Sequence, residues 1–515
     1  MEGALFGTET EYACAGSLAP AEAAIRVKEG IFAARKYGLI EPAPREWGEV
    51  PGNGGFLFNG GRMYLDSGHL EFATPECRTL EELVAMERAG DQILNATVQD
   101  LGLSSDVFFI KNNADHFGHT YGYHENYCLR VSPRSRDMVQ GLLPFLVTRQ
   151  LYAGAGMLSP AAQRGRPSPG RSGGSGGSGQ NVPFQISQRA SFVSVDVSHR
   201  VRFGGRPILN LRDEPLAGGR YRRLHIIIGD ANRSENATAL KIGSTALVAQ
   251  LLEQGWDPEI ELENPVAALK EIARNPFGGW TVRTSRSSSP VPAIEIQRAY
   301  LLEATKRFMG RDKDTDWTLR HWATLLSALE LDPMRLDGYV DWVTKYKQLA
   351  DYAEKSPKGW EDPALIKLDL AYHHINPSVS LFTLLRKQGK VPAFVDDAAA
   401  ERAMHQPPVE SRAAGRGHVV RAMAEARADD SIRWEVLARR LGERAVWGDE
   451  RFVVYEYVDD WRDIRDTGAW HIIPYLVDWG AVAVKDHVLE LPDPFRDYAE
   501  ESERFGKSIP ALLRR

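Results

Sequence analysis

Two glutamates lie two residues apart in a largely apolar segment close to the N-terminus. Glu9 and Glu11 fall within the first dozen residues, whose pattern predicts a β-strand. Side chains alternate between the two faces of a strand, so both carboxylates point the same way and repel each other unless a cation lies between them. The spacing predicts a metal site, although alternating charge is also typical of the solvated face of an antiparallel sheet.

A second acidic group follows downstream. Asp66 ends a predicted strand that begins at Arg62, and Glu71 lies in the next segment, which begins at His69. Mg²⁺ prefers hard oxygen ligands and usually keeps waters and substrate phosphates, so a few carboxylates on neighbouring strands suffice to bind it. The two acidic segments together predict one site for Mg²⁺ and a nucleotide.

Asp66 also has the chemistry of a catalytic residue. A carboxylate beside Mg²⁺ can act as a general base toward an amine or water, or can itself attack a carbonyl. The spacing equally allows Asp66 to be a further metal ligand or the cap of a strand end.

Amide, carboxylate and guanidinium groups recur further along the chain. They lie in Lys111-Asn112-Asn113, His124-Glu125-Asn126, Ser187-Gln188-Arg189, Arg212-Asp213-Glu214-Pro215, Arg220 to His225 and Asp230 to Glu235. Such oxygens hold metals or polar substrates, and arginine binds phosphate and carboxylate bidentately. Turn-capping asparagines and solvated surface arginines are the alternative interpretation. Because the chain has no Walker-type glycine loop, we expect arginines and metal to hold any phosphates.

Composition is that of an ordinary globular protein. The chain has 515 residues, of which 43% are hydrophobic and 26% charged, and a formal net charge of −6. The length predicts one large domain with one or two small ones, and the charge gives no sign of nucleic-acid binding. Three scattered cysteines, no targeting pattern at the N-terminus and no long apolar segment predict a cytoplasmic protein without a membrane span.

Strand and helix patterns are interspersed and predict an α+β fold. We expect helices over residues 20–37 and 79–101 and through much of 235–385, and strands over 62–66, 107–111, 125–131 and 223–228. The strand patterns favour an antiparallel sheet over a run of βαβ units. Residues 159–180 include a Gly/Ser tract whose composition predicts a flexible loop.

Taken together, the motifs resemble the Pup ligase and depupylase family (PafA and Dop). They are Gly7-Thr8-Glu9-Thr10-Glu11-Tyr12, Asn59-Gly60-Gly61-Arg62, Tyr64-Leu65-Asp66, Lys111-Asn112-Asn113, His124-Glu125-Asn126-Tyr127, Ser187-Gln188-Arg189, Arg212-Asp213-Glu214-Pro215 and Tyr221-Arg222-Arg223-Leu224-His225. The resemblance implies a glutamine-synthetase-like domain over residues 1–415, with an antiparallel sheet packed against helices, and a small C-terminal domain over 416–515. It also implies ATP and Mg²⁺ as cofactors and the ubiquitin-like protein Pup, or its conjugates, as partner.

The resemblance also implies roles for individual residues. Asp66 matches the family's catalytic aspartate. Glu9, Tyr64 and Glu71 match its Mg²⁺ ligands, and Arg62, Thr74 and Trp434 match its ATP contacts. To these we add Glu11 as a metal ligand from the strand pattern, and Arg212 and Arg223 as phosphate-binding residues from the arginine cluster.

The family contains two opposite activities. A ligase phosphorylates the C-terminal Glu side chain of Pup and passes the acyl group to a substrate lysine, whereas a depupylase hydrolyses that isopeptide bond and can deamidate a terminal Gln. The spacing from Asp66 to Glu71 and the segments 184–189 and 229–232 resemble depupylases. The short segment between Glu9 and Asp66 and the segments 370–373 and 493–496 resemble ligases. Because the residues nearest the catalytic aspartate resemble depupylases, we predict a depupylase, with Pup–protein ligase as the alternative.

Two hypotheses come from other classes. A non-catalytic scaffold with this fold predicts loss of the acidic residues, yet Glu9, Glu11, Asp66 and Glu71 are all present. A small-molecule carboxylate–amine ligase of the glutamine synthetase or glutamate–cysteine ligase kind would use ATP and Mg²⁺ in the same way. The tryptophan-rich stretch 445–486 departs from both the ligase and the depupylase patterns.

Overall fold

The computed structural model describes residues 1–45, 49–159, 183–198, 205–211, 220–447, 450–455 and 472–514. Residues 160–180 of the predicted loop and Arg212 of the predicted site lie outside these ranges. Within them, one large sheet is packed against helices, which confirms the α+β class.

A large sheet forms the centre of the molecule. Its strands run in the order β10, β11, β12, β7, β1, β5, β4, β3, β2, and β6 also pairs with β1. They are β1 (Phe6–Gly16), β2 (Gly38–Ile40), β3 (Gly54–Leu57), β4 (Arg62–Asp66), β5 (His69–Ala73), β6 (Val107–Ile110), β7 (Tyr123–Leu129), β10 (Val195–Ser198), β11 (Pro207–Asn210) and β12 (Arg222–Ile226). Neighbours are antiparallel except β10 and β11, which are parallel.

The two faces of the sheet differ in character. Along β1, Thr8, Thr10 and Tyr12 are buried, whereas Glu9 and Glu11 are only partly buried on the other face. Helices α2 (Leu80–Asp100) and α4 (Glu235–Glu253) pack against the buried face. The strand alternation therefore leaves one face of the sheet for polar chemistry.

Local sequence sets the ends of these elements. Helix α2 begins with a capping box, in which the Thr79 hydroxyl accepts from the Glu82 backbone N–H and the Glu82 carboxylate accepts from the Thr79 N–H. Helix α1 (Pro20–Ala33) ends before the predicted residue 37, because Arg35 has a φ of 49° and the chain turns into β2. Strand β7 begins two residues earlier than predicted, at Tyr123.

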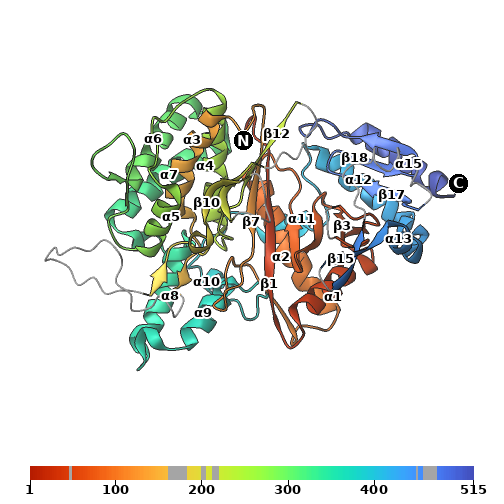
Figure 1. Cartoon of the computed structure of the whole chain (residues 1–515), viewed down its shortest axis with the longest axis horizontal. Helices are drawn as coiled ribbons and strands as arrows, with labels where there is room; N and C mark the ends of the chain where they lie inside the picture. Colours follow the sequence, from red (N-terminus) through yellow and green to blue (C-terminus); the bar gives the residue numbers. More distant parts are fainter. Residues whose placement is uncertain are drawn as a thin grey trace.

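A helical body lies on one side of the sheet (Figure 1). Its helices are α3 (Arg136–Ala153), α5 (Pro265–Arg274), α6 (Ala293–Phe308), α7 (Lys313–Leu331), α8 (Asp341–Lys355), α9 (Ala364–His373) and α10 (Leu381–Lys387). The short pairs β8 (Met157–Leu158) with β9 (Phe184–Gln185) and β13 (Thr281–Val282) with β14 (Val291–Pro292) lie in its connections. Together with α2 and α4 the body forms the largest hydrophobic core, which includes Trp322 and Trp342.

The C-terminal elements lie on the opposite side of the sheet (Figure 1). They follow α11 (Asp397–Ala403) and are α12 (Arg412–Glu425), α13 (Trp434–Leu441), β15 (Gly442–Trp447), β16 (Glu450–Tyr455), β17 (Tyr475–Val477), β18 (Ala481–Val484), β19 (His487–Glu490) and α15 (Ala499–Arg514). Their core also includes Leu39, Phe56 and Phe58 from the N-terminal sheet. The predicted boundary at residue 415 falls within α12, and the division into two domains stays a prediction.

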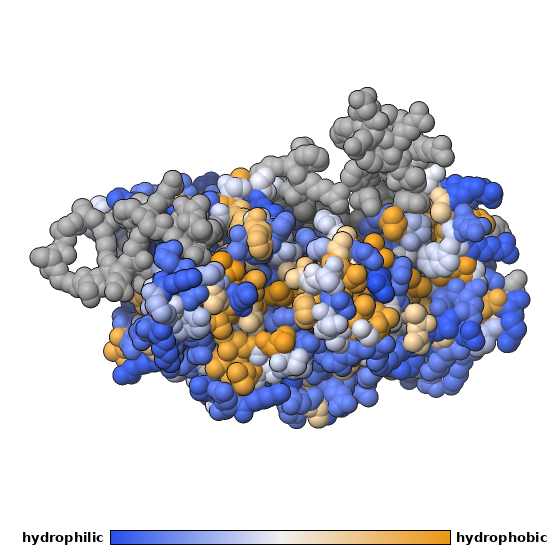
Figure 2. All heavy atoms as spheres, turned by 90° about the horizontal axis from the view of Figure 1, so that it is seen from below, coloured by the Kyte–Doolittle hydropathy of each residue, from blue (hydrophilic) through white to orange (hydrophobic). Residues whose placement is uncertain are grey.

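The surface is mixed. The face seen in Figure 2 is mostly hydrophilic, with hydrophobic side chains gathered near its middle. Among the described residues, no helix has both the length and the apolar character that crossing a membrane requires.

Candidate active site

A row of polar side chains crosses the open face of strands β1, β5 and β4. Glu11 pairs with Glu71 in the β1–β5 register, and Glu71 pairs with Tyr64 in the β4–β5 register. The Tyr64 hydroxyl donates a hydrogen bond of 2.6 Å to Oε1 of Glu71. Directly paired residues point to the same face, so the sheet register alone brings these three side chains together.

Asp66 joins this row through a tight hairpin. Strands β4 and β5 are connected by Ser67 and Gly68, whose φ angles of 51° and 88° are those of a type I′ turn. The turn pairs Asp66 with His69, and the His69 ring Nδ1 lies 3.1 Å from Oε2 of Glu11. Ligand oxygens of Glu11, Asp66 and Glu71 consequently lie within 4.8 Å of one another.

These carboxylates perturb one another's ionisation. Burial, together with the negative charges of Glu9, Glu11 and Asp66, raises the pKa of Glu71 well above its usual value, although the Tyr64 hydrogen bond opposes this. Burial would also raise the pKa of Glu11, but His69, His124 and the Gly122 backbone lower it overall. Three carboxylates with ligand oxygens this close together are the donor set that a hard divalent cation fits.

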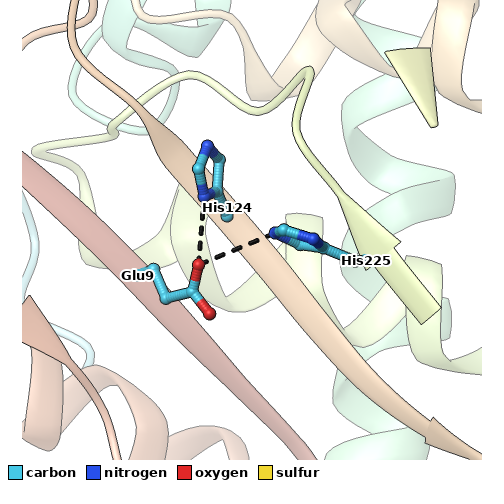
Figure 3. A group of neighbouring side chains, drawn as sticks. All are labelled: Glu9, His124 and His225. Carbon is cyan, nitrogen blue, oxygen red and sulfur yellow. Dashed lines mark hydrogen bonds and ion pairs between the residues drawn. The ribbon is translucent and has the colours of Figure 1, made fainter. Parts of the chain in front are cut away.

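Glu9 belongs to a second group, drawn in Figure 3. Its Oε2 lies 3.0 Å from His124 Nδ1 and 3.6 Å from His225 Nε2. Its Oε1 accepts hydrogen bonds from Asn126, at 3.0 Å, and from Arg223, at 2.8 Å. Burial would raise the pKa of Glu9, but Arg223 and the two histidines hold it well below its usual value, so this carboxylate is ionised.

His225 has a donor atom available for a ligand. Its Nε2 is buried, and the 3.6 Å separation from Glu9 is too long for a hydrogen bond. Burial, aided by the charge of Arg223, lowers the pKa of His225 to about 3, so the imidazole is neutral near pH 7. Glu9, His124 and His225 have ligand atoms within 4.8 Å of one another, and neutral imidazole with carboxylate suits divalent transition metals, whereas Mg²⁺ prefers oxygen ligands.

The residues expected to contact ATP occupy three different places. Arg62 begins β4 and is buried, and its guanidinium carbon lies 4.4 Å from the centre of the Tyr64 ring. Thr74 is buried, and its hydroxyl accepts from the Thr8 backbone N–H at 2.9 Å. Trp434 begins α13, is 39% exposed and lies over Gly52. Arg223 is bonded to Glu9 and Asn126, so it orders the acidic site directly.

A cavity of about 120 Å³ opens beside Glu9, between the sheet and the C-terminal elements. Apolar atoms dominate its walls, which also carry three arginines. The residues that line it include Phe6, Gly7, Ala73, Thr74, Tyr127, Arg222, Arg223, Arg412, Trp479 and Pro494. Apolar walls with arginines at one side suit a flat base joined to an anionic group.

The predicted residues thus fall into two neighbouring acidic groups, whereas the sequence predicts one site for Mg²⁺ and a nucleotide. Glu11 and Glu71 lie together with Asp66, whereas Glu9 lies with two histidines that the sequence patterns did not single out as ligands. In the sequence, His124 begins the polar motif His124-Glu125-Asn126, and His225 ends the arginine cluster that begins at Arg220. Pairing of β7 with both β1 and β12 brings them to Glu9.

Comparison with known proteins identifies close relatives. A family model described as Pup-ligase protein matches residues 4–438. The Pup–protein ligase of Acidimicrobium ferrooxidans is 40% identical over 394 residues, which are 74% of this chain and 82% of that protein. The depupylase of Acidothermus cellulolyticus is 38% identical over 372 residues, which are 70% of each protein.

Two solved structures also resemble this chain. The Pup ligase PafA in its complex with Pup is 29% identical, with a TM-score of 0.75, and the match covers 99% of this chain and 92% of that one. PafA in complex with ADP is 30% identical, with a TM-score of 0.69, over 89% of this chain and 90% of that one.

Proposed function

The chain belongs to the Pup-ligase protein family, and from this premise we propose that it is a Pup–protein ligase that uses ATP and Mg²⁺. It joins the C-terminal glutamate of a Pup-like protein to the side-chain amine of a target lysine. This proposal takes the alternative of the sequence prediction in place of the depupylase.

The share of each relative that aligns with this chain favours ligation over cleavage. The chain aligns with 82% of the A. ferrooxidans ligase but with 70% of the A. cellulolyticus depupylase. The two solved structures compared above are both of the Pup ligase PafA, one with Pup and one with ADP. The short segment between Glu9 and Asp66 supports the same choice, whereas the spacing from Asp66 to Glu71 is the feature that favours a depupylase.

Binding of the co-substrates is assigned to the open face of the sheet. Glu11, Glu71 and Tyr64 would hold one Mg²⁺, and Glu9 with His124 and His225 would hold a second divalent cation. Within the described part of the chain, the buried Nε of Arg62 has no hydrogen-bond partner, which suits a phosphate oxygen. When bound, ATP and Mg²⁺ supply the phosphoryl group that makes the glutamate side chain reactive toward an amine.

Asp66 is the proposed catalytic residue. It lies at the rim of the acidic row and is partly exposed, so a lysine from a protein substrate can approach it from solvent. Its carboxylate would accept the proton that the lysine Nζ loses as the new C–N bond to the glutamyl carbon forms and the C–O bond to the leaving phosphate breaks. Glu11 and Glu71 would keep this carboxylate close to the reacting groups, because all three lie within 4.8 Å.

We also place this reaction in a reducing cytoplasm. Cys14, Cys77 and Cys128 form no disulfide, which supports that setting.

The direction of the reaction is tested by two parallel incubations of the purified chain with ATP and Mg²⁺. One contains free Pup ending in Glu and a lysine-bearing target, and the other contains a preformed Pup conjugate. A ligase forms conjugate in the first and releases little Pup in the second. Release of Pup in the second, without conjugate in the first, would establish a depupylase. ATP turnover with free glutamate and a small amine, but no Pup chemistry, would indicate a small-molecule ligase.

A further inference from the structure

Arg62 forms ion pairs with two acidic residues, Glu41 and Glu49. Its Nη2 lies 3.5 Å from Oε2 of Glu41 and 3.7 Å from Oε2 of Glu49. Among the described residues the Nε of Arg62 has no hydrogen-bond partner, and the guanidinium lies over the Tyr64 ring. The two acids therefore contact the guanidinium through Nη2, and the Nε donor is left for another acceptor.

Glu41 depends on arginines for its charge balance. It directly follows β2 and is only 2% exposed, and neither carboxylate oxygen has a hydrogen bond from a residue that the structure describes. Its ion pairs are with Arg62 and, at 3.2 Å between Oε1 and Nε, with Arg45. A buried carboxylate with so few donors is costly, so its position is tied closely to both arginines.

Arg45 extends the chain of contacts to the C-terminal elements. Its Nη2 donates to the Val477 carbonyl at 2.9 Å and lies 3.1 Å from Oδ1 of Asp478. Val477 ends β17, and the Asp478 backbone N–H donates to the Ala481 carbonyl at the turn into β18. A continuous path of buried charge thus runs from β17 through Arg45 and Glu41 to Arg62.

We propose that Glu41 and Arg45 are positioning residues for the nucleotide: they fix the Arg62 guanidinium relative to β17 and thereby set the affinity for the ATP phosphates without touching ATP. This inference rests on the proposed function, because it takes Arg62 as an ATP contact. It predicts that the C-terminal elements contribute to nucleotide binding at a distance, through the ion pairs of Arg45.

The test is a double-mutant cycle on ATP affinity in the full chain. Isothermal titration calorimetry with ATP and Mg²⁺ compares the wild type with Arg62→Met, Arg45→Met and the double variant. Burial raises the pKa of Glu41 to about 7, against the opposing effect of Arg45 and Arg62, so the titrations are run at pH 8, where this carboxylate is ionised. Arg78→Met is the matched control, since Arg78 pairs with Glu410 at 3.1 Å between the same halves of the chain but away from Arg62.

Each single variant should weaken ATP binding about tenfold, and the double variant should be no weaker than Arg62→Met. Turnover at saturating ATP should change little in Arg45→Met, so KM rises while kcat is kept. If Arg45→Met does not fold, Glu41→Gln, which conserves shape, is measured in its place.

Several results would overturn the inference. If Arg45→Met binds ATP as tightly as the wild type while Arg62→Met binds it more weakly, this inference is wrong and the proposed function stands. A double variant in which the two losses multiply means that Arg45 acts independently of Arg62. Equal weakening by Arg78→Met means that any loosening of the C-terminal elements has this effect. A wild-type chain that binds no ATP contradicts the proposed function and this inference with it.

Discussion

Glu11 and Glu71 face each other directly across the antiparallel ladder of β1 and β5. Like charges opposite each other in a ladder destabilise a sheet. Here Asp66 adds a third carboxylate within 4.8 Å, and Glu71 is 2% exposed. The arrangement costs folding free energy in the metal-free chain, which is expected where a binding site is built for a cation.

Glu71→Gln should therefore stabilise the metal-free protein while it weakens cation binding. Removing one charge from the group should raise the free energy of unfolding by about 1 kcal/mol and the melting temperature by about 1 °C. The rise in melting temperature that Mg²⁺ gives the wild type should shrink or vanish in the variant. Differential scanning calorimetry with and without Mg²⁺ measures both effects.

The control for this experiment is Glu81→Gln. Glu81 lies on the exposed side of α2, where it pairs with Lys313 at 3.4 Å. It should change neither the melting temperature nor the response to Mg²⁺. A Glu71→Gln protein that is less stable without metal and still gains the full stabilisation from Mg²⁺ would contradict the assignment of this acidic row.

His225→Asn should remove the cation that we assign to Glu9. The imidazole is neutral at pH 7 because burial and Arg223 lower its pKa to about 3, so it can serve as a ligand without losing a proton. Titration with Mn²⁺, followed by the electron paramagnetic resonance signal of the free ion, should show one bound Mn²⁺ fewer than in the wild type. His487→Asn, at an exposed position, is the control. An unchanged stoichiometry in His225→Asn would exclude this group as a cation site.

Glu76 should stabilise the contact between the sheet and α12 in a pH-dependent way. Burial would raise its pKa, but Arg416 and Arg412, each 2.5 Å away, lower it from 4.5 to about 2. A carboxylate whose pKa is lowered on folding stabilises the folded protein at pH values above the pKa that the group has in the unfolded chain. The contribution should be complete above about pH 4.5 and should disappear as the pH falls toward 2.

Glu76→Gln should consequently cost about 3 kcal/mol at pH 7, because Arg416 is left buried without its charge partner. The difference in thermal stability between this variant and the wild type should narrow as the pH falls below 4.5. Glu303→Gln, on the surface of α6, serves as the reference for an exposed pair. A difference that stays constant from pH 7 to pH 3 would show that the ion pairs are not its source.

Local patterns were sufficient for much of the sheet and for half of the candidate site. Strand β4 has the bounds that its residues predict, and α2 (Leu80–Asp100) differs from the predicted helix over 79–101 by one residue at each end. The alternation of Glu9 and Glu11 correctly placed both on one face. These features depend on short-range periodicity and capping, which the sequence displays directly.

The rest of the site depends on contacts between distant segments. His225 reaches Glu9 only because β12 pairs with β7 and β7 pairs with β1, an order that no local pattern specifies. Glu41 and Arg45 belong to no motif in the sequence, and their partners lie in β4 and directly after β17. Topology, rather than residue type, decides which side chains share a site in these cases.

We propose that ligation takes place at Asp66, on the open face of β1, β4 and β5. The most direct measurement is conjugate formation from Pup ending in Glu and a lysine-bearing target by the wild type, Asp66→Asn and the control Asp100→Asn, with ATP affinity measured in parallel. We expect the rate of conjugate formation to fall about a thousandfold in Asp66→Asn while its ATP affinity is unchanged. Asp100→Asn should behave as the wild type. Conjugation at the wild-type rate in Asp66→Asn would contradict it.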